Sequence, residues 1–220
     1  MEIKIAIASN INFADKTLPI IINSLKESGV SNHRIYAFIT GHMIESVEVI
    51  DDIHYVYVNH NSYECSALIS IVENKFTSDY WFLIHDTCKV GKNFNNLLSS
   101  NLNGEFYEKV ALTVRPSMCI GLYKYDYLIT IKDSILNLKN QDYSEETLIK
   151  LKTWFIDNED LIMWRTEPLP KLPANHIMQV IGYENWFGTE TRRKTEYFPS
   201  FDIYKNKSNW GQSHTVTNKI

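Results

Sequence analysis

One apolar run of the chain stops abruptly at a polar group, and this boundary is a clear structural signal in the sequence. Tyr80 to Ile84 is made of aromatic and aliphatic residues, and His85, Asp86 and Thr87 follow directly. A short run rich in β-forming residues is typical of a strand buried on both faces, in the middle of a parallel sheet. Ligands of open α/β sheets bind just beyond the carboxyl ends of such strands, so we expect a site there.

The rest of the pattern alternates between strands and amphipathic helices. Apolar residues spaced as on one helix face begin at Leu18, with Asp15 or Thr17 as a candidate cap and Gly29 after the end. Two more helical stripes run from Cys65 to Phe76 and from Leu128 to Leu138, and residues 87–94 look like a turn. Further strands are expected at Ile3 to Ala8, Ile35 to Ile39, His54 to Val58, Val110 to Val114 and Met118 to Tyr123.

This order of elements predicts an α/β fold. Strands alternating with helices favour a largely parallel sheet with helices on its faces. We therefore expect a three-layer α/β/α architecture with a mostly parallel central sheet. A length of 220 residues, without an internal repeat or a clear linker, predicts a single domain over residues 1–220.

Composition removes some classes of function. A net charge of −4 argues against a general nucleic-acid-binding protein. Three dispersed cysteines without C-x-x-C spacing fit reduced thiols better than a disulfide framework. No apolar run reaches the roughly 18 residues that a membrane span needs, and no signal-peptide pattern precedes Ile3. We therefore expect a cytoplasmic protein without a transmembrane segment.

Asp86 has two interpretations. A carboxylate at a strand end, together with phosphate oxygens and water, is a common way to hold Mg²⁺ or Mn²⁺. Asp is also a common cap of the turn that follows a strand. His85 beside it is either a ligand or a hydrogen-bonded spacer.

Three groups late in the chain offer further chemistry. Glu159 and Asp160 can supply a general base toward a hydroxyl nucleophile, or they form a solvated helix start that the helix dipole favours. The basic run at Arg192 and Arg193 can stabilise a departing diphosphate, or it lies on a solvated strand edge. His214 stands in a Trp-Gly segment and is a candidate metal ligand.

Several common catalytic motifs are absent. The sequence has no G-x-x-x-x-G-K-[ST], no G-x-G-x-x-G after its first strand and no G-x-S-x-G. P-loop chemistry, a dinucleotide-binding fold and an α/β-hydrolase are therefore disfavoured.

Three stretches together resemble the GT-A-fold glycosyltransferases, which use nucleotide-sugar donors. The opening, Ile5 to Asn10 and then Leu18 to Leu25, is similar to their first strand and helix. Asp79 to Thr87 is similar to the strand that leads into their D-x-D metal motif, with Ile84 in place of the first Asp. Asn158 to Asp160 is similar to their x-E-D motif. The glycine-rich, arginine-containing opening of the related nucleotide-sugar pyrophosphorylases is missing.

The resemblance implies an enzyme that moves a hexosyl or deoxyhexosyl group from a nucleoside-diphosphate sugar to a hydroxyl acceptor, such as a glycan, with inversion. Asp86 and His214 would bind Mn²⁺ or Mg²⁺, and Asp160 with Glu159 beside it would deprotonate the acceptor. Contacts to the nucleotide sugar are implied for Ser9, Asn10, His85, Asp86, Arg192 and Arg193.

Two other functions are open. The lost first Asp is also what a non-catalytic module that binds a nucleotide or a glycan would show. A nucleotidyltransferase on the same fold would instead release pyrophosphate from a nucleoside triphosphate.

Overall fold

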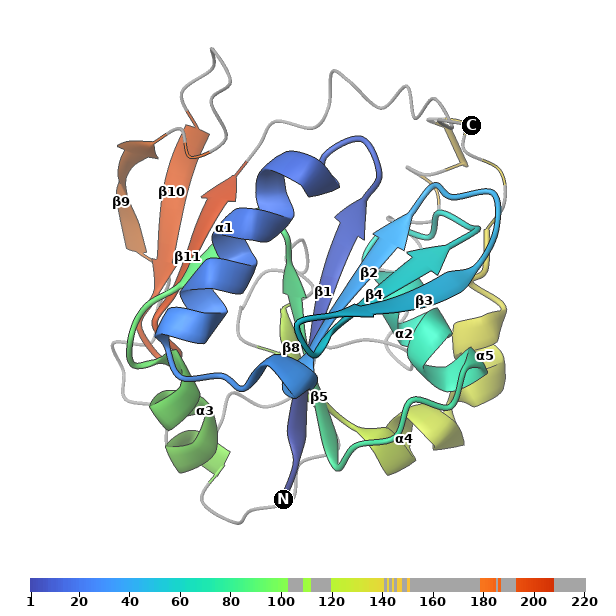
Figure 1. Cartoon of the computed structure of the whole chain (residues 1–220), viewed down its shortest axis with the longest axis horizontal. Helices are drawn as coiled ribbons and strands as arrows, with labels where there is room; N and C mark the ends of the chain where they lie inside the picture. Colours follow the sequence, from blue (N-terminus) through green and yellow to red (C-terminus); the bar gives the residue numbers. More distant parts are fainter. Residues whose placement is uncertain are drawn as a thin grey trace.

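The fold contains two β-sheets with helices around the larger one (Figure 1). The computed structural model describes residues 1–102, 109–111, 120–140, 142, 144, 146–147, 150, 179–184, 186 and 193–207. Among these residues the larger sheet has seven strands in the order β3-β4-β2-β1-β5-β8-β7, and the smaller has four in the order β6-β11-β10-β9.

The strands of the larger sheet are β1 (Ile3–Asn10), β2 (Ile35–Thr40), β3 (Ser46–Ile50), β4 (Ile53–Val58), β5 (Tyr80–His85), β7 (Lys109–Ala111) and β8 (Gly121–Lys124). Those of the smaller sheet are β6 (Cys88–Val90), β9 (Gln179–Glu184), β10 (Arg193–Phe198) and β11 (Ile203–Lys207). The helices are α1 (Ala14–Glu27), α2 (Cys65–Glu73), α3 (Phe94–Leu102), α4 (Tyr125–Thr130), α5 (Lys132–Leu136) and a 3₁₀ turn, η1 (Asn32–Arg34).

The direction of the strands makes the larger sheet mixed. β4, β2, β1 and β5 are parallel neighbours, whereas β3 and β8 run antiparallel to β4 and β5, and β7 runs antiparallel to β8. The predicted α/β class is therefore confirmed, and the prediction of a parallel sheet holds for these four strands but not for the edges. The single domain over residues 1–220 stays a prediction.

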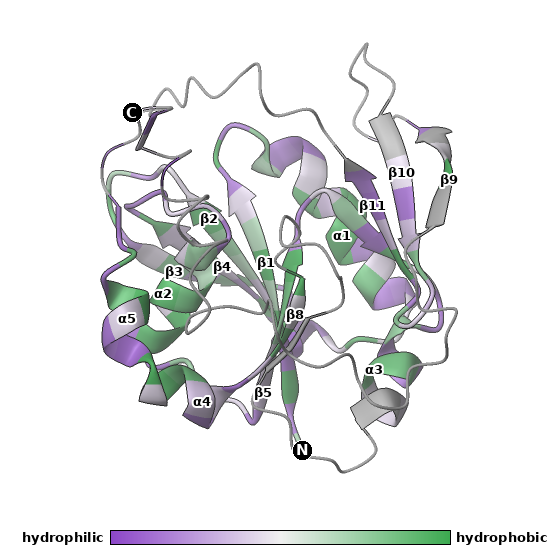
Figure 2. Cartoon of the chain, turned by 180° about the vertical axis from the view of Figure 1, so that it is seen from behind, coloured by the Kyte–Doolittle hydropathy of each residue, from purple (hydrophilic) through white to green (hydrophobic). Residues whose placement is uncertain are grey.

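Alternating side chains of the central strands fill two separate apolar cores. On β1 and β5, Ile5, Ile7, Phe82 and Ile84 belong to one core, which also contains the buried faces of α1 and α3. Trp81 and Leu83 belong to the other core, with residues of α2, α4 and α5. Figure 2 shows that β1 and β5 are more hydrophobic than β10 and β11 of the smaller sheet.

The position of β5 follows from this double burial. Tyr80 to Ile84 are each at most 2% exposed, so the strand has no solvent face. Burial of such side chains contributes about 1.5–3 kcal/mol each relative to exposure. The sequence-based prediction of a central buried strand is confirmed.

Several predicted boundaries are corrected. α1 begins at Ala14 without a side-chain cap, so neither Asp15 nor Thr17 caps it, whereas Gly29 follows its end with a φ of +87° as expected. The stripe from Leu128 to Leu138 forms two short helices, α4 and α5, that meet at Ile131.

The strands predicted at Val110 to Val114 and Met118 to Tyr123 correspond to β7 and β8, in part outside the described residues. Residues 87–94, expected as a turn, contain β6, which pairs with β11 more than a hundred positions later in the sequence. No helix in the described residues is both long and apolar enough to cross a membrane.

Candidate functional site

The carboxyl ends of β1 and β5 lie side by side, and the connections of the sheet diverge between them. From β1 the chain moves to β2 and then β4 on one side, and it returns through α2 to β5 on the other side. In the parallel register Ala8 is paired with His85, so the residues that follow, Ser9 and Asp86, are at the same edge. Such a switch in strand order at a carboxyl edge is where open α/β sheets bind ligands.

Asp86 joins three elements at this edge. Its Oδ2 accepts a hydrogen bond of 2.7 Å from the Ser9 hydroxyl, at the end of β1. A second hydrogen bond of 2.7 Å comes from the Thr17 hydroxyl, in the first turns of α1. The Asp86 backbone N–H also donates to the carbonyl of Ala8 at 3.1 Å. Asp86 therefore fixes the β1–α1 junction against β5.

The surroundings of Asp86 act on the pKa of its carboxyl in opposite directions. The residue is 8% exposed, and burial raises the pKa of its carboxyl above the ordinary value. Hydrogen bonds from Ser9 and Thr17 and the positive charge of Lys205 oppose that rise without cancelling it.

His85 lies between two charged groups that are distant in the sequence. Its Nδ1 is 3.3 Å from Nζ of Lys205 on β11, and its Nε2 is 3.6 Å from a carboxylate oxygen of Glu64, just before α2. When the ammonium donates to Nδ1, the ring proton is on Nε2 and faces Glu64. His85 thus lies between Lys205 and Glu64, and its role as a ligand or a spacer stays a prediction.

The smaller sheet is tied directly to this edge. The backbone N–H of Asn206 on β11 donates to the carbonyl of Thr87 at 2.9 Å, and β6 continues from Cys88. Burial raises the pKa of the Cys88 thiol to about 12, so it stays a thiol at neutral pH and is no nucleophile.

Asn10, predicted to contact the nucleotide, is engaged within the chain at both ends of its amide. Its Nδ2 donates to the Thr40 hydroxyl at 2.9 Å, and its Oδ1 accepts from the backbone N–H of Asn12 at 3.0 Å. These bonds shape the loop after β1 and link it to the end of β2.

The structure thus brings Ser9, Asn10, His85 and Asp86 to one edge. Arg193 begins β10, opposite Glu184 of β9, and its side chain lies outside the described residues. Glu159, Asp160, Arg192 and His214 also lie outside the described residues, so their roles stay predictions.

Sequence reasoning missed two residues of the site, Thr17 and Lys205. Thr17 lies among the apolar residues that form the buried face of α1, and it is 69 positions away from Asp86 in the sequence, so no local pattern connects the two residues. Lys205 is 7% exposed and reaches the site only because β11 pairs with β6. A lysine in an alternating strand usually points to solvent.

The described residues around Asp86 fit a divalent cation poorly. One carboxylate oxygen already accepts two hydroxyl hydrogen bonds, and the Lys205 ammonium adds a like charge nearby. Ile84, in the position of the first D-x-D acid, is fully buried in the core beneath α1. Hard cations need several oxygen ligands, which these residues do not supply.

No protein-family model matches the chain, and no curated protein matches it either.

Proposed function

We propose that the chain is a glycosyltransferase that binds a nucleoside-diphosphate sugar at the carboxyl edge between β1 and β5 and transfers the sugar to a hydroxyl acceptor. The observation that supports it most is the Ser9–Asp86–Thr17 contact, which joins the ends of two adjacent parallel strands at the switch in strand order. An edge of this kind is the usual ligand site of an open α/β sheet.

The arrangement of helices on both faces of the larger sheet agrees with the GT-A architecture that the sequence resembles. In this proposal the loop after β1, shaped by Asn10, receives the nucleotide. The buried contacts of Asp86 hold that loop in position for the donor, which limits the entropy lost on binding.

Positive charge at the edge would favour the diphosphate. Lys205 lies beside His85 and contributes a positive charge toward Asp86. Cationic groups near a leaving diphosphate stabilise the charge that develops on it. Binding of Mn²⁺ or Mg²⁺ at Asp86, and base catalysis by Asp160 with Glu159, stay predictions that turnover assays decide.

A second candidate is a non-catalytic module that binds a nucleotide or a glycan at the same edge. Its support is specific: Ile84 is core, and Asp86 serves as an internal hydrogen-bond acceptor. Such a module would bind a nucleotide without consuming any donor.

The test has two stages. A thermal-shift series with UDP, GDP, dTDP and CMP, with and without Mn²⁺, identifies the nucleotide, because a ligand of the native state raises its stability. Release of sugar is then followed with the matching donors, in the wild type, in Asp86→Asn and in the exposed-site control Asp126→Asn.

We expect one nucleotide to raise the melting temperature by several degrees and its donor to be consumed. Asp86→Asn removes the charge and puts an amide N–H donor in place of the second carboxylate oxygen at the proposed donor site, so it is expected to lose at least tenfold in turnover, which is about 1.4 kcal/mol of barrier, whereas Asp126→Asn keeps the wild-type rate. Nucleotide binding without turnover of any donor would favour the module. If none of the nucleotides binds, both the glycosyltransferase proposal and the binding-module proposal are overturned.

A further inference from the structure

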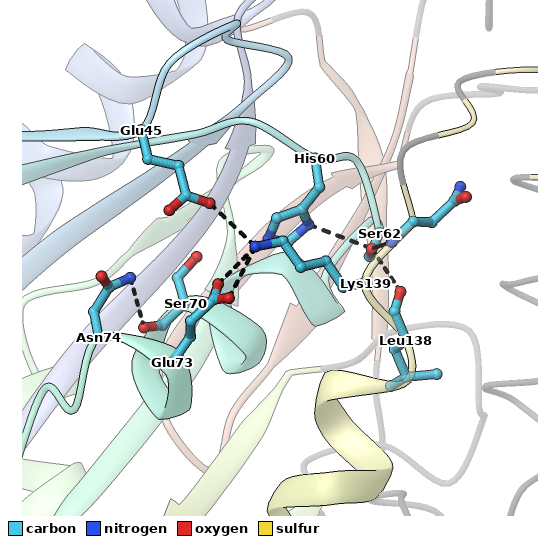
Figure 3. A network of polar contacts seen from close by, with 9 residues as sticks. Glu45, His60, Ser62, Ser70, Glu73, Asn74, Leu138 and Lys139 are labelled. Carbon is cyan, nitrogen blue, oxygen red and sulfur yellow. Dashed lines mark hydrogen bonds and ion pairs between the residues drawn. The ribbon is translucent and has the colours of Figure 1, made fainter.

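A second polar group, formed by Glu45, His60, Glu73 and Lys139, lies apart from Asp86 (Figure 3). Glu45 directly precedes β3, His60 follows β4, Glu73 ends α2 and Lys139 follows α5. One possible ligand atom each from Glu45, His60 and Glu73 lie within 4.8 Å of one another. Four separate elements therefore direct these side chains to one place.

His60 supplies an observation that is independent of the two acids. The side chain is fully buried, and its Nε2 has no hydrogen-bond partner among the described residues. Figure 3 shows the imidazole between Ser62 on one side and Glu45 and Glu73 on the other. A buried nitrogen without a partner is costly, so its position needs a reason.

The tautomer of His60 follows from its neighbour. The Ser62 hydroxyl donates its proton to the carbonyl of Leu138 at 2.7 Å. Nδ1 of His60 is 3.4 Å from Oγ of Ser62. Since that hydroxyl proton is already used, Nδ1–H is the donor in the second contact. Nε2 is then left with its lone pair, which is the form that binds a metal.

The group already holds a cation. Nζ of Lys139 lies 2.9 Å from both carboxylate oxygens of Glu73 and 3.4 Å from Oε1 of Glu45. Partial burial alone would lower the pKa of Lys139, but the hydrogen bonds and charges of Glu73 and Glu45 outweigh it and raise that pKa. The ammonium sits on a flexible stem and is partly exposed, so it can leave.

We propose that Glu45, His60 and Glu73 form a binding site for a divalent transition metal of the Zn²⁺ class, and that Lys139 occupies this site when the metal is absent. One imidazole with two carboxylates is a donor set that Zn²⁺ accepts, and it is less suited to Mg²⁺, which prefers oxygen alone. Three protein ligands leave a coordination position for water.

The distances are compatible with closure around an ion. Bonds of about 2.0–2.1 Å to Zn²⁺ require ligand atoms roughly 3.3 Å apart, so atoms that lie within 4.8 Å of one another must approach by at most about 1.5 Å. Both glutamates are about one-third exposed, at 35% and 36%, and their long side chains allow that movement once the ammonium has left. Burial, assisted by the Lys139 charge, lowers the pKa of His60 to about 4, which keeps the imidazole neutral at physiological pH.

Calorimetric titration of the EDTA-treated full chain with ZnCl₂ at pH 7.5 tests the site. The wild type is expected to bind one Zn²⁺ at this site, and Mg²⁺ at least a hundredfold more weakly. Glu73→Gln, which changes a partly exposed side chain and preserves the fold, is expected to weaken Zn²⁺ binding at least tenfold. His60→Gln is expected to do the same.

Lys139→Met provides the sharpest comparison. Removal of the competing ammonium should tighten Zn²⁺ binding several-fold, whereas Lys132→Met, at an exposed position of α5, should leave the affinity unchanged. Asp86→Asn should also leave it unchanged, which separates this site from the proposed donor site.

Two results would overturn the proposal. One is Zn²⁺ binding that is absent in the wild type, including the case in which only Lys139→Met binds, because the ammonium is then the permanent occupant. The other is binding that is insensitive to both Glu73→Gln and His60→Gln, because the ion then lies elsewhere.

Discussion

Asp86 connects three elements through one carboxylate oxygen, and this connection can be broken in two chemically different ways. Asp86→Ala removes the acceptor and leaves the hydroxyls of Ser9 and Thr17 to find other partners in a buried place. Thr17 has an alternative acceptor, since its hydroxyl is 3.0 Å from the carbonyl of Phe13. Asp86→Asn keeps an acceptor oxygen and removes the ionisable group.

We therefore expect Asp86→Ala to lower the free energy of unfolding by about 1–3 kcal/mol, and Asp86→Asn to lower it by less than about 1 kcal/mol or to raise it. Urea unfolding at pH 7 measures both. Equal losses in the two variants would contradict the hydrogen-bond role of the carboxyl. For this reason the turnover assay uses Asn rather than Ala.

The raised pKa of Asp86 adds a pH dependence to the same comparison. A carboxyl whose pKa is higher in the folded state contributes stability in acid, and loses it as the pH rises through that value. Asp86→Asn has no such titration. Its free energy of unfolding relative to the wild type should therefore increase from acid toward neutral pH, and a decrease over that range would contradict the assigned shift.

The contribution of single residues was predictable where the signal was local. His85 ends the buried strand β5 and Asp86 directly follows it, so their location at a sheet edge needed no information from elsewhere in the chain. Thr17 and Lys205 could not be predicted in the same way, because each reaches Asp86 through packing of another element. The polar group of Glu45, His60, Glu73 and Lys139 could not be predicted for the same reason, since its members come from four separate segments of the chain.

The strands differ in how clearly the pattern of apolar residues predicts them. β1, β2, β4 and β5 have continuous or alternating buried residues, and all four were predicted. β3 was missed because all five of its residues are exposed, so burial imposes no period on Ser46–Ile50. β6 was missed because it has three residues and takes its partner from the far end of the chain.

The start of α3 depends on close packing at Gly91. The backbone N–H of Gly91 donates to the carbonyl of Asp202 at 2.7 Å, and the Asp202 carboxylate accepts from the backbone N–H of Asn93 at 3.1 Å. A Cβ on Gly91 would overlap that carboxylate. This contact ties the segment after β6 to the turn before β11.

We expect Gly91→Ala to lower the free energy of unfolding by about 1–3 kcal/mol through this overlap. Lys92→Ala, at the next and exposed position, should change it by less than about 0.5 kcal/mol. Chemical denaturation of both variants checks the difference.

A double-mutant cycle identifies the cause. Asp202 has a φ of +54°, which Gly adopts without strain, so Asp202→Gly removes the carboxylate while keeping the turn. If the overlap is responsible, Gly91→Ala should cost clearly less in the Asp202→Gly background than in the wild type. If the losses in unfolding free energy of the two substitutions simply add, the overlap with the Asp202 carboxylate is not the cause.

Across the molecule, the two sheets and α1 converge on the loops that follow β1 and β5. α1 packs on one face of the larger sheet, and β11 reaches the same edge through Asn206 and Lys205. The central α/β pattern could be predicted because hydrophobic burial repeats along neighbouring strands. The smaller sheet could not, because its pairing joins residues 88–90 to residues 203–205 and has no local signature.

The central claim is that this edge binds a nucleoside diphosphate, and hydrogen exchange followed by mass spectrometry tests it most directly. The full chain is compared with and without the nucleotide that stabilises it most. We predict slower exchange of the backbone amides in residues 10–14 and 86–91, which follow β1 and β5. Protection that avoids both segments, or no nucleotide that protects any segment, would contradict the account.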